Sequence, residues 1–278
     1  MARAAVPGRL SWRVATVKET RDETATARTL LLDVPGWPGH LPGQHVAVKL
    51  TAEDGYSAQR DYSIASPPEG GRVELPVVEL TVQRLDDGEV SSYLAGIAEP
   101  GDQFEVRGPI GGWFAWRADD PRPLLLLAGG SGVVPLMSMI RTHAQAGSQV
   151  PVRLIYSART PADVIYATEL AERASSSLLP HPEGLPIGNR QEKRARSVSP
   201  LTVTYLYTRA PLSMADDPPR SYTGRLNAKI LAATSFPPQA NPAIFACGPS
   251  GFVETASDLL VAAGHLPGMI KTERFGPT

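Results

Sequence analysis

The sequence predicts two domains, an N-terminal antiparallel β-barrel of Greek-key type and a C-terminal α/β domain with a parallel sheet. The chain has 278 residues, which suits two domains better than one, because a domain usually has about 100–200 residues. Up to residue 106, short segments rich in Val, Thr and Leu alternate with Gly and Pro turns. After residue 117, short apolar runs alternate with helical patterns. The first pattern is typical of a barrel or sandwich, the second of a doubly wound sheet.

Strands of the first domain are expected where polar and apolar residues alternate, because a strand with one buried face has a period of two. These segments are residues 12–20, 28–34, 44–50 and 77–84. Turns between them are indicated by Pro and Gly at 35–36, 42–43, 67–68 and 70–71. One helical pattern, residues 91–98, interrupts the strands.

The second domain begins with a wholly apolar run at 124–127, which is typical of a strand buried on both faces. Further strands are expected at 152–156, 201–207 and 243–246, and helices at 133–146, 162–173, 225–232 and 252–263. This alternation predicts a parallel sheet with helices on both faces. We place the boundary at 118–121, which gives domains of 1–118 and 119–278.

Composition excludes several classes of protein. Lys and Arg number 27 and Asp and Glu 28, a near-neutral balance that argues against general binding to nucleic acid. The single cysteine, Cys247, excludes an internal disulfide, a four-cysteine zinc site and a four-cysteine iron–sulfur cluster. No histidine spacing indicates a metal site. No apolar run approaches the ~20 residues of a membrane helix, and no signal peptide is visible, so we expect a cytoplasmic protein without a membrane partner.

Residues 175–199 do not fit either pattern. They contain several Pro and Gly residues and a basic run at 193–196. Loops longer than about 12–15 residues are uncommon inside a compact domain. We interpret the segment as a mobile surface insertion rather than a docking site, because runs of charge are usually solvated.

The strongest local signal is the tetrapeptide Arg60-Asp61-Tyr62-Ser63. On a strand, Arg60 and Tyr62 point to the same face. The guanidinium supplies a planar fork for a phosphate, the phenol ring a flat surface for an aromatic ligand, and Ser63 a small donor. Together they predict a site for a phosphorylated flat ring such as a flavin. The alternative is an ordinary strand with a surface Arg and a core Tyr, which the tetrapeptide alone would favour.

A second signal is a Gly-rich turn between the apolar run at 124–127 and a helix whose first turn contains Pro135. The turn consists of Gly129, Gly130, Ser131 and Gly132. Glycines let backbone amides approach a phosphate, and a helix N-terminus attracts negative charge. The spacing matches neither the usual dinucleotide fingerprint nor a hydrolase nucleophile elbow.

A third signal is Cys247-Gly248, at the end of another apolar strand. Ligands of open parallel sheets bind at the carboxyl ends of the strands. The alternative is a cysteine that is simply buried, since cysteine is among the most buried residue types.

The order of Pro-Gly-Gln at 42–44, the Arg60 motif, the Gly-rich turn and Cys-Gly-Pro at 247–249 resembles the ferredoxin–NADP reductase superfamily. The closest likeness is to the flavin and nicotinamide domains of oxygenase reductases, over roughly residues 12–275. The resemblance implies FAD, with FMN less favoured, in the barrel and NADPH or NADH in the second domain. It implies hydride transfer from nicotinamide to flavin. Because one cysteine excludes the iron–sulfur domain that many oxygenase reductases carry, it implies a separate acceptor such as a ferredoxin or an oxygenase component.

Two other functions remain open from the sequence. One is an NAD(P)H:flavin reductase that releases free reduced flavin. The other is a flavin-binding electron-transfer subunit that is inactive without its partner.

The resemblance also implies roles for matching residues of the barrel. Arg60 would bind the flavin phosphate, Tyr62 would lie against the isoalloxazine ring, and Ser63 would hydrogen-bond near flavin N5. Ile64 and Ser66 would line the same strand beside the cofactor. A second phosphate-binding helix would start at 88–94, with N-cap residues Ser91 and Ser92.

In the second domain, the resemblance assigns the pyrophosphate of the nicotinamide cofactor to the Gly-rich turn. Cys247 and Gly248 would lie near the reactive nicotinamide carbon, and Phe275 would cover the second flavin face. Hydride transfer needs no side-chain acid or base, so the residues assigned to catalysis are expected to tune and position the cofactors. They are Ser63 and Cys247, with Glu273 as a further candidate.

The choice between the two nicotinamide cofactors is expected to depend on the end of the strand at 152–156. Ser157 and Arg159 follow it, and no Asp or Glu occurs until Asp163. A Ser and an Arg favour a 2′-phosphate, whereas a carboxylate would favour a free 2′-hydroxyl. The sequence therefore favours NADPH over NADH. His45, next to Gln44, is expected to pack within its strand, with contact to the flavin as the alternative.

Overall fold

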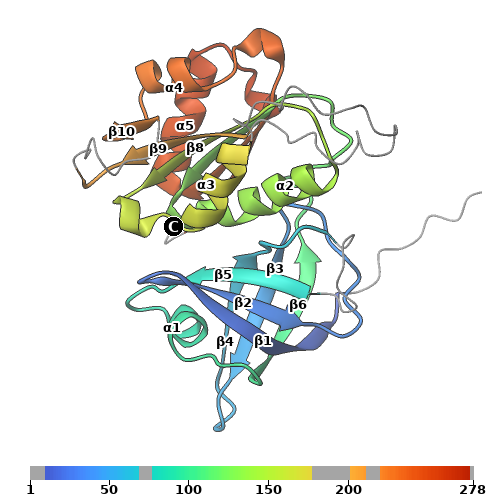
Figure 1. Ribbon diagram of the computed structural model, residues 1–278. Helices are drawn as coiled ribbons and strands as arrows, with labels where there is room; N and C mark the ends of the chain where they lie inside the picture. Colours follow the sequence, from blue (N-terminus) through green and yellow to red (C-terminus); the bar gives the residue numbers. More distant parts are fainter. Residues whose placement is uncertain (1–9, 69–76, 177–200, 211–219, 276–278) are drawn as a thin grey trace, which may run out of the picture.

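The computed structural model describes residues 10–68, 77–176, 201–210 and 220–275. Beyond Ser176, where helix α3 ends, the insertion expected at 175–199 lies outside the described residues. Two six-stranded sheets, one per domain, form the frame of the molecule (Figure 1). Within the described ranges, every helix is too short or too polar to cross a lipid bilayer.

The N-terminal domain is an antiparallel barrel, as predicted. Its strands are β1 (Trp12–Thr24), β2 (Ala27–Asp33), β3 (His45–Thr51), β4 (Ser57–Ser63), β5 (Val77–Gln83) and β6 (Gln103–Ile110). Their order is β4-β3-β6-β1-β2-β5, with β6 between β1 and β3 as in a Greek key. A bridge between Ile64 and Leu80 links the two edge strands and closes the barrel. Helix α1 (Glu89–Gly96) starts two residues earlier than predicted.

The C-terminal domain has the predicted parallel sheet. Its strands are β7 (Leu124–Gly129), β8 (Val152–Ala158), β9 (Leu201–Tyr207), β10 (Ser221–Thr223), β11 (Ala243–Pro249) and β12 (Ile270–Phe275), in the order β10-β9-β8-β7-β11-β12. The leucine run of β7 is central and fully buried, as a strand covered on both faces requires. Helices α2 (Val133–Gln145) and α3 (Ala167–Ser176) cover the face toward the barrel. Helices α4 (Ala228–Thr234) and α5 (Ser250–Ala262) cover the other.

Several elements differ from the sequence prediction. Strand β6 was not among the predicted strands of the barrel. Short strands β10 and β12 were not expected, because each has too few alternating residues to be distinguished from a loop. The helix expected at 162–173 is divided into a single turn at Pro161–Asp163 and helix α3. Tyr166, between them, has a positive φ of 61°, which no helix can contain.

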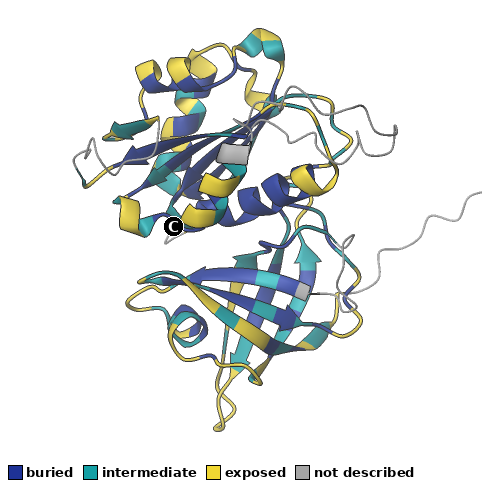
Figure 2. Ribbon diagram, viewed as in Figure 1, coloured by how far each residue is buried: buried dark blue, intermediate teal, exposed yellow. Residues whose placement is uncertain are grey.

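Helix α2 is buried along almost its whole length. Every residue from Val133 to His143 is buried (Figure 2). A helix on the outside of a doubly wound domain normally exposes one face. Here the parallel sheet covers one side of α2 and the barrel faces the other (Figure 1), so this helix forms part of the contact between the domains.

Candidate functional site

Strand β4 presents the Arg60 motif at an edge of the barrel sheet. Arg60 and Tyr62 lie on one face of β4, opposite Val48 and Val46 of β3. The Tyr62 ring is partly buried against the barrel core. Arg60 is exposed, and within the described residues its guanidinium donates only to the carbonyl oxygen of Gln59, at 2.7 Å. Most of its N–H groups are therefore available to a phosphate.

Ser63 ends β4 beside titratable side chains from both domains. It pairs with His45 of β3. Nδ1 of His45 lies 3.5 Å from Oε1 of Glu273 in β12, and Nε2 lies 4.0 Å from Oδ2 of Asp61. Because β12 belongs to the C-terminal sheet, the His45–Glu273 contact joins the two domains at the end of β4. The structure thus places two predicted site residues beside His45: Ser63 is its partner in the strand register, and Glu273 contacts its imidazole ring.

The surroundings favour the uncharged forms of His45 and Glu273. Burial raises the pKa of Glu273 to about 7, and the negative charge of Asp61 adds to the rise. Burial also lowers the pKa of His45, against an opposing effect of Asp61. Oε2 of Glu273 is buried and has no hydrogen-bond partner in the described part of the chain. A carboxyl group with a pKa near neutrality and an unbonded oxygen can hold or pass a proton at this place.

Cys247 and Phe275 lie next to Glu273 at the ends of β11 and β12. Cys247 is paired with Glu273 in the sheet register. Cys247 is 1% exposed, and burial raises the pKa of its thiol, so the thiol stays protonated and is not suited to act as a nucleophile. Phe275 is 37% exposed. Its ring is therefore free to cover a ligand, and the predicted role of Phe275 stays a prediction.

The Gly-rich turn brings the ends of β7 and β11 into contact. A Cβ on Gly132 would lie 2.1 Å from the carbonyl oxygen of Cys247, and one on Gly248 would lie 3.0 Å from Cα of Gly129. These three glycines permit close packing of backbone on backbone. Gly130 differs, because it has a φ of +54° and its added Cβ would have only a side-chain oxygen of β5 within 4 Å, at 3.8 Å. The open part of the turn is therefore at Gly130 and the half-buried Ser131.

The N-terminus of α2 follows this turn and fits an anionic ligand. Its N-cap is Gly132, no side chain caps its first N–H groups, and its first turn contains no acidic residue. The N–H of Val133 already donates to the carbonyl oxygens of Gly130 and Ser131, and Pro135 has no N–H. It is therefore chiefly the positive end of the helix dipole that favours a phosphate here. The turn and the helix start together fit the predicted pyrophosphate site.

The start of α1 corrects one prediction. The helix begins at Glu89 with Gly88 as its N-cap, so Ser91 and Ser92 lie inside the helix rather than at the cap. The Ser91 hydroxyl accepts from the backbone N–H of Leu85 and donates to the carbonyl oxygen of Gly88. The Ser92 hydroxyl donates to the carbonyl oxygen of Leu85. Both hydroxyls therefore bond back to the preceding turn, as short polar side chains often do.

Ile64 and Ser66 lie in the core and at the domain contact, not on an open strand face. Ile64 is fully buried in the barrel. The Ser66 hydroxyl accepts from the backbone N–H of Glu79, and its carbonyl oxygen accepts from the Ser138 hydroxyl of α2 at 2.6 Å. These residues hold the continuation of β4 in place.

The end of β8 carries the side chains expected to select the nicotinamide cofactor. Ser157 is half-buried and Arg159 is exposed. The backbone of Arg209 donates to the carbonyl oxygen of Arg159 at 2.8 Å, which brings a second exposed Arg to this edge. The carboxylate of Asp163 accepts from the backbone and hydroxyl of Thr160. Asp163, the acidic residue nearest in sequence to Arg159, is thus engaged in a capping box with Thr160.

Comparison with known proteins agrees with this division of the chain. Residues 14–114 match the model of the oxidoreductase FAD-binding domain, and residues 126–179 match the model of the oxidoreductase NAD-binding domain. The chain belongs to the ferredoxin–NADP reductase superfamily. This confirms the family, the FAD-binding and NAD-binding domains and the fold predicted from the sequence.

Relatives of this reductase-family chain include components of oxygenases. It is 30% identical over 239 residues to the glycine betaine monooxygenase reductase subunit of Pseudomonas aeruginosa, covering 85% of this chain and 56% of the relative. It is 34% identical over 164 residues to ferredoxin–NADP reductase B of Sorangium cellulosum, covering 58% of this chain and 60% of that protein. The chain thus spans little more than half the length of these relatives.

A solved structure of the same fold is the ferredoxin–NADP⁺ reductase of Neisseria gonorrhoeae, which contains bound FAD and NADP. The two folds agree with a TM-score of 0.71 at 19% identity, over 95% of this chain and 98% of the other.

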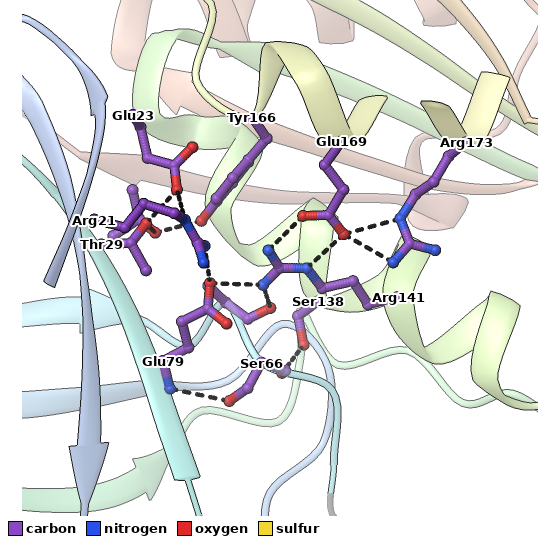
Figure 3. A network of polar contacts seen from close by, with 12 residues as sticks. Arg21, Glu23, Thr29, Ser66, Glu79, Ser138, Arg141, Tyr166, Glu169 and Arg173 are labelled. Carbon is purple, nitrogen blue, oxygen red and sulfur yellow. Dashed lines mark hydrogen bonds and ion pairs between the residues drawn. The ribbon is translucent and has the colours of Figure 1, made fainter. Parts of the chain in front are cut away.

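One contact between the two domains of this reductase-family chain was not predicted from the sequence. Arg141 of α2, Glu79 of β5 and Tyr166 form a buried polar contact between barrel and sheet (Figure 3). One signal was present in the sequence: Arg141 interrupts an otherwise apolar stretch of helix. A buried arginine needs a partner, but only the fold shows that Glu79, far away in sequence, is that partner.

Proposed function

We propose that the chain is a flavin-dependent reductase that takes a hydride from NADPH onto FAD and passes electrons to a separate acceptor, such as a ferredoxin or an oxygenase component. One observation carries the proposal. Ser63, at the end of the barrel strand with the Arg60 motif, is paired with His45 in the strand register, and Glu273, in the last strand of the C-terminal sheet, contacts the His45 ring. A site for two ring systems needs such a junction, because hydride transfer requires the reacting atoms to be ~3–3.5 Å apart.

The side chains of this chain would bind the two cofactors and orient their rings. Arg60 would pair with the flavin phosphate, and Tyr62 would support one face of the ring. The Ser63 hydroxyl would donate at the ring edge, and Glu273, protonated near neutral pH, would hold a proton next to it. The uncharged Cys247 thiol would pack at the reacting edge without competing as a nucleophile. The bound flavin itself supplies the electron chemistry, including acceptance of two electrons and their release one at a time.

The finer assignment to NADPH is supported by Arg159 and by the engagement of Asp163 with Thr160. A guanidinium recognises a 2′-phosphate, whereas a free carboxylate at this position would repel it. The proposal of a separate acceptor is supported by the names of the relatives, which are reductase subunits or components of monooxygenases.

An anaerobic titration of the purified protein with NADPH and then NADH tests the proposal. We expect FAD to stay bound through gel filtration and its absorbance to bleach with one equivalent of NADPH, at lower concentration than with NADH. Loss of the flavin on the column, with turnover only when free flavin is added, would favour a reductase that releases reduced flavin. Bound flavin that neither nucleotide bleaches would contradict the proposal.

A further inference from the structure

Helix α2 connects the two candidate cofactor sites. Its N-terminus follows the Gly-rich turn, and its middle carries Ser138 and Arg141, one helical turn apart, toward the barrel. Ser138 and Arg141 bond the carbonyl oxygens of Ser66 and Ala65, at 2.6 and 3.0 Å. These two carbonyl oxygens come two and three residues after Ser63, the last residue of β4.

Arg141 is the centre of the contact. It is 9% exposed and binds Glu169 of α3 through two hydrogen bonds, Nε to Oε1 at 3.0 Å and Nη2 to Oε2 at 2.6 Å. Its Nη1 donates to Oε1 of Glu79 in β5, at 3.0 Å, as well as to Ala65. Figure 3 shows the guanidinium between the two carboxylates, one from each domain. Four directed hydrogen bonds fix a buried guanidinium in one orientation.

The barrel side of this contact is itself tied to β4. Ala65 donates to the carbonyl oxygen of Glu79 at 2.7 Å, and the N–H of Glu79 donates to the Ser66 hydroxyl at 3.1 Å. Arg21 adds a further ion pair to Glu79, at 3.2 Å. These hydrogen bonds therefore link the Glu79 carboxylate, which Arg141 binds, to the strand that carries Ser63.

A second contact lies beside the first. The fully buried Tyr166 donates its hydroxyl to Thr81 of β5, and Thr81 is hydrogen-bonded to Thr29, at 2.7 Å. The Tyr166 ring lies under the Arg141 guanidinium, 5.0 Å from its centre to Cζ. The positive φ of Tyr166 is unfavourable for a non-glycine residue and is held by this packing.

We propose that Arg141, supported by Ser138, is a positioning residue that sets the separation of the two cofactor rings. The inference rests on the proposed function. The Gly-rich turn runs directly into α2, and the segment after Ser63 is hydrogen-bonded to Ser138 and Arg141 of the same helix. A displacement of α2 against β4 would therefore move the turn relative to Ser63. A misplacement of about 1 Å between reacting atoms lowers a rate by as much as ~100-fold. Arg141 thus acts on hydride transfer without touching either cofactor.

The test compares four variants of the holoprotein by anaerobic stopped flow, following flavin bleaching at saturating NADPH. We expect Arg141→Gln to slow the limiting rate about tenfold or more, Arg141→Lys to restore part of it, and Ser138→Ala to slow it severalfold. The matched control is Arg173→Gln, which removes an ion pair to the same Glu169 from within α3 and leaves the contacts to the barrel intact. It should react like the wild type.

A second readout separates positioning from simple loss of stability. The charge-transfer absorbance of nicotinamide stacked on flavin should weaken in Arg141→Gln, while flavin retention and the Kd for NADPH stay within about twofold of the wild type. If Arg141→Gln does not fold, Arg141→Lys and Ser138→Ala decide by the same readouts. The positioning role would be overturned if the variants showed wild-type rates and charge-transfer bands. It would also be overturned if they lost flavin instead of reacting more slowly. Either result would leave the proposed function standing. A wild-type protein that no nicotinamide reduces would overturn the proposed function and this inference with it.

Discussion

The flavin side and the nicotinamide side of the site are built differently. On the barrel, the candidate contacts are side chains on a strand edge, with Arg60 exposed and Tyr62 half-buried. In the second domain, the candidate contact to the pyrophosphate is backbone, held by Gly129, Gly132 and Gly248, where an added Cβ would lie 3.0 Å or less from other atoms. Side chains at an edge can be exchanged without moving the fold, whereas a backbone site is part of the packing. Substitutions on the barrel should therefore change binding, and substitutions in the Gly-rich turn should change stability.

The sharpest test of this difference is Gly132→Ala. The new Cβ would lie 2.1 Å from the carbonyl oxygen of Cys247, which is backbone and cannot swing aside. We expect the free energy of unfolding to fall by about 3 kcal/mol or more, measured by urea denaturation. Gly251→Ala, in α5 with no atom within 4 Å of the new Cβ, is the control and should leave the free energy of unfolding unchanged or raise it by up to about 1 kcal/mol, because alanine favours a helix more than glycine does. Equal stability of the two variants would refute the packing role of the turn.

The complementary change on the barrel is Arg60→Ala. Because Arg60 is exposed and bonds only its neighbour within the described residues, stability should hardly change. Loss of hydrogen bonds to a charged phosphate should weaken FAD binding about 10- to 100-fold, measured by flavin retention on gel filtration and by a fluorescence titration. Arg28→Ala, at a half-buried barrel arginine paired with Asp22, should retain FAD like the wild type. Full flavin content in Arg60→Ala would argue against the phosphate role.

Where the two domains meet, Glu273→Gln tests the raised pKa of Glu273. The pKa is about 7 in the folded protein and ordinarily 4.5, so the folded state holds an extra proton between these values. The Glu273 carboxyl group therefore costs the folded protein no stability below about pH 4.5, and this cost grows as the pH rises to about 7. Relative to the wild type, the free energy of unfolding of Glu273→Gln should gain about 2–3 kcal/mol between pH 5 and pH 8, measured by urea unfolding at each pH. Parallel pH profiles for the two proteins would mean that the carboxyl group is not held neutral.

The smallest expected effect concerns the choice of nicotinamide cofactor. Arg159→Ala should raise the Kd for NADPH about fivefold to tenfold, the effect of one charge-assisted hydrogen bond at an exposed site. The Kd for NADH, which lacks the 2′-phosphate, should stay unchanged and serves as the internal control. Isothermal titration of both nucleotides measures the two constants. An equal loss of affinity for NADPH and for NADH would mean that Arg159 does not contact the 2′-phosphate.

The sequence predicted the elements with strong periodicity and missed what depends on long-range contacts. The leucine run of β7 and strand β9 were predicted within two residues, because apolar pattern alone defines a buried strand. Strands β10 and β12 were missed, since their positions depend on pairing with β9 and β11 rather than on their own pattern. The prediction of Ser91 and Ser92 as N-caps was wrong, because Gly88 closes the preceding turn and starts the helix earlier.

For the site, individual residues could be predicted from the sequence, but which of them lie together in space could not. Ser63 and Glu273 are 210 positions apart, and only the fold brings both to His45. Likewise, Arg141 was visible as a charge within an apolar helix, but its partner Glu79 follows from the docking of two domains, which no local pattern encodes.

The central claim, that the rings of the two cofactors meet at the end of β4, is tested most directly by a single-turnover reaction. Wild-type protein with bound FAD is mixed anaerobically with saturating NADPH, either unlabelled or carrying deuterium at the transferable C4 position, and flavin absorbance is followed. The account predicts that the flavin bleaches in one step and more slowly with the deuterated nucleotide. Bound flavin that stays oxidised with both forms of NADPH, and equally with NADH, would contradict it.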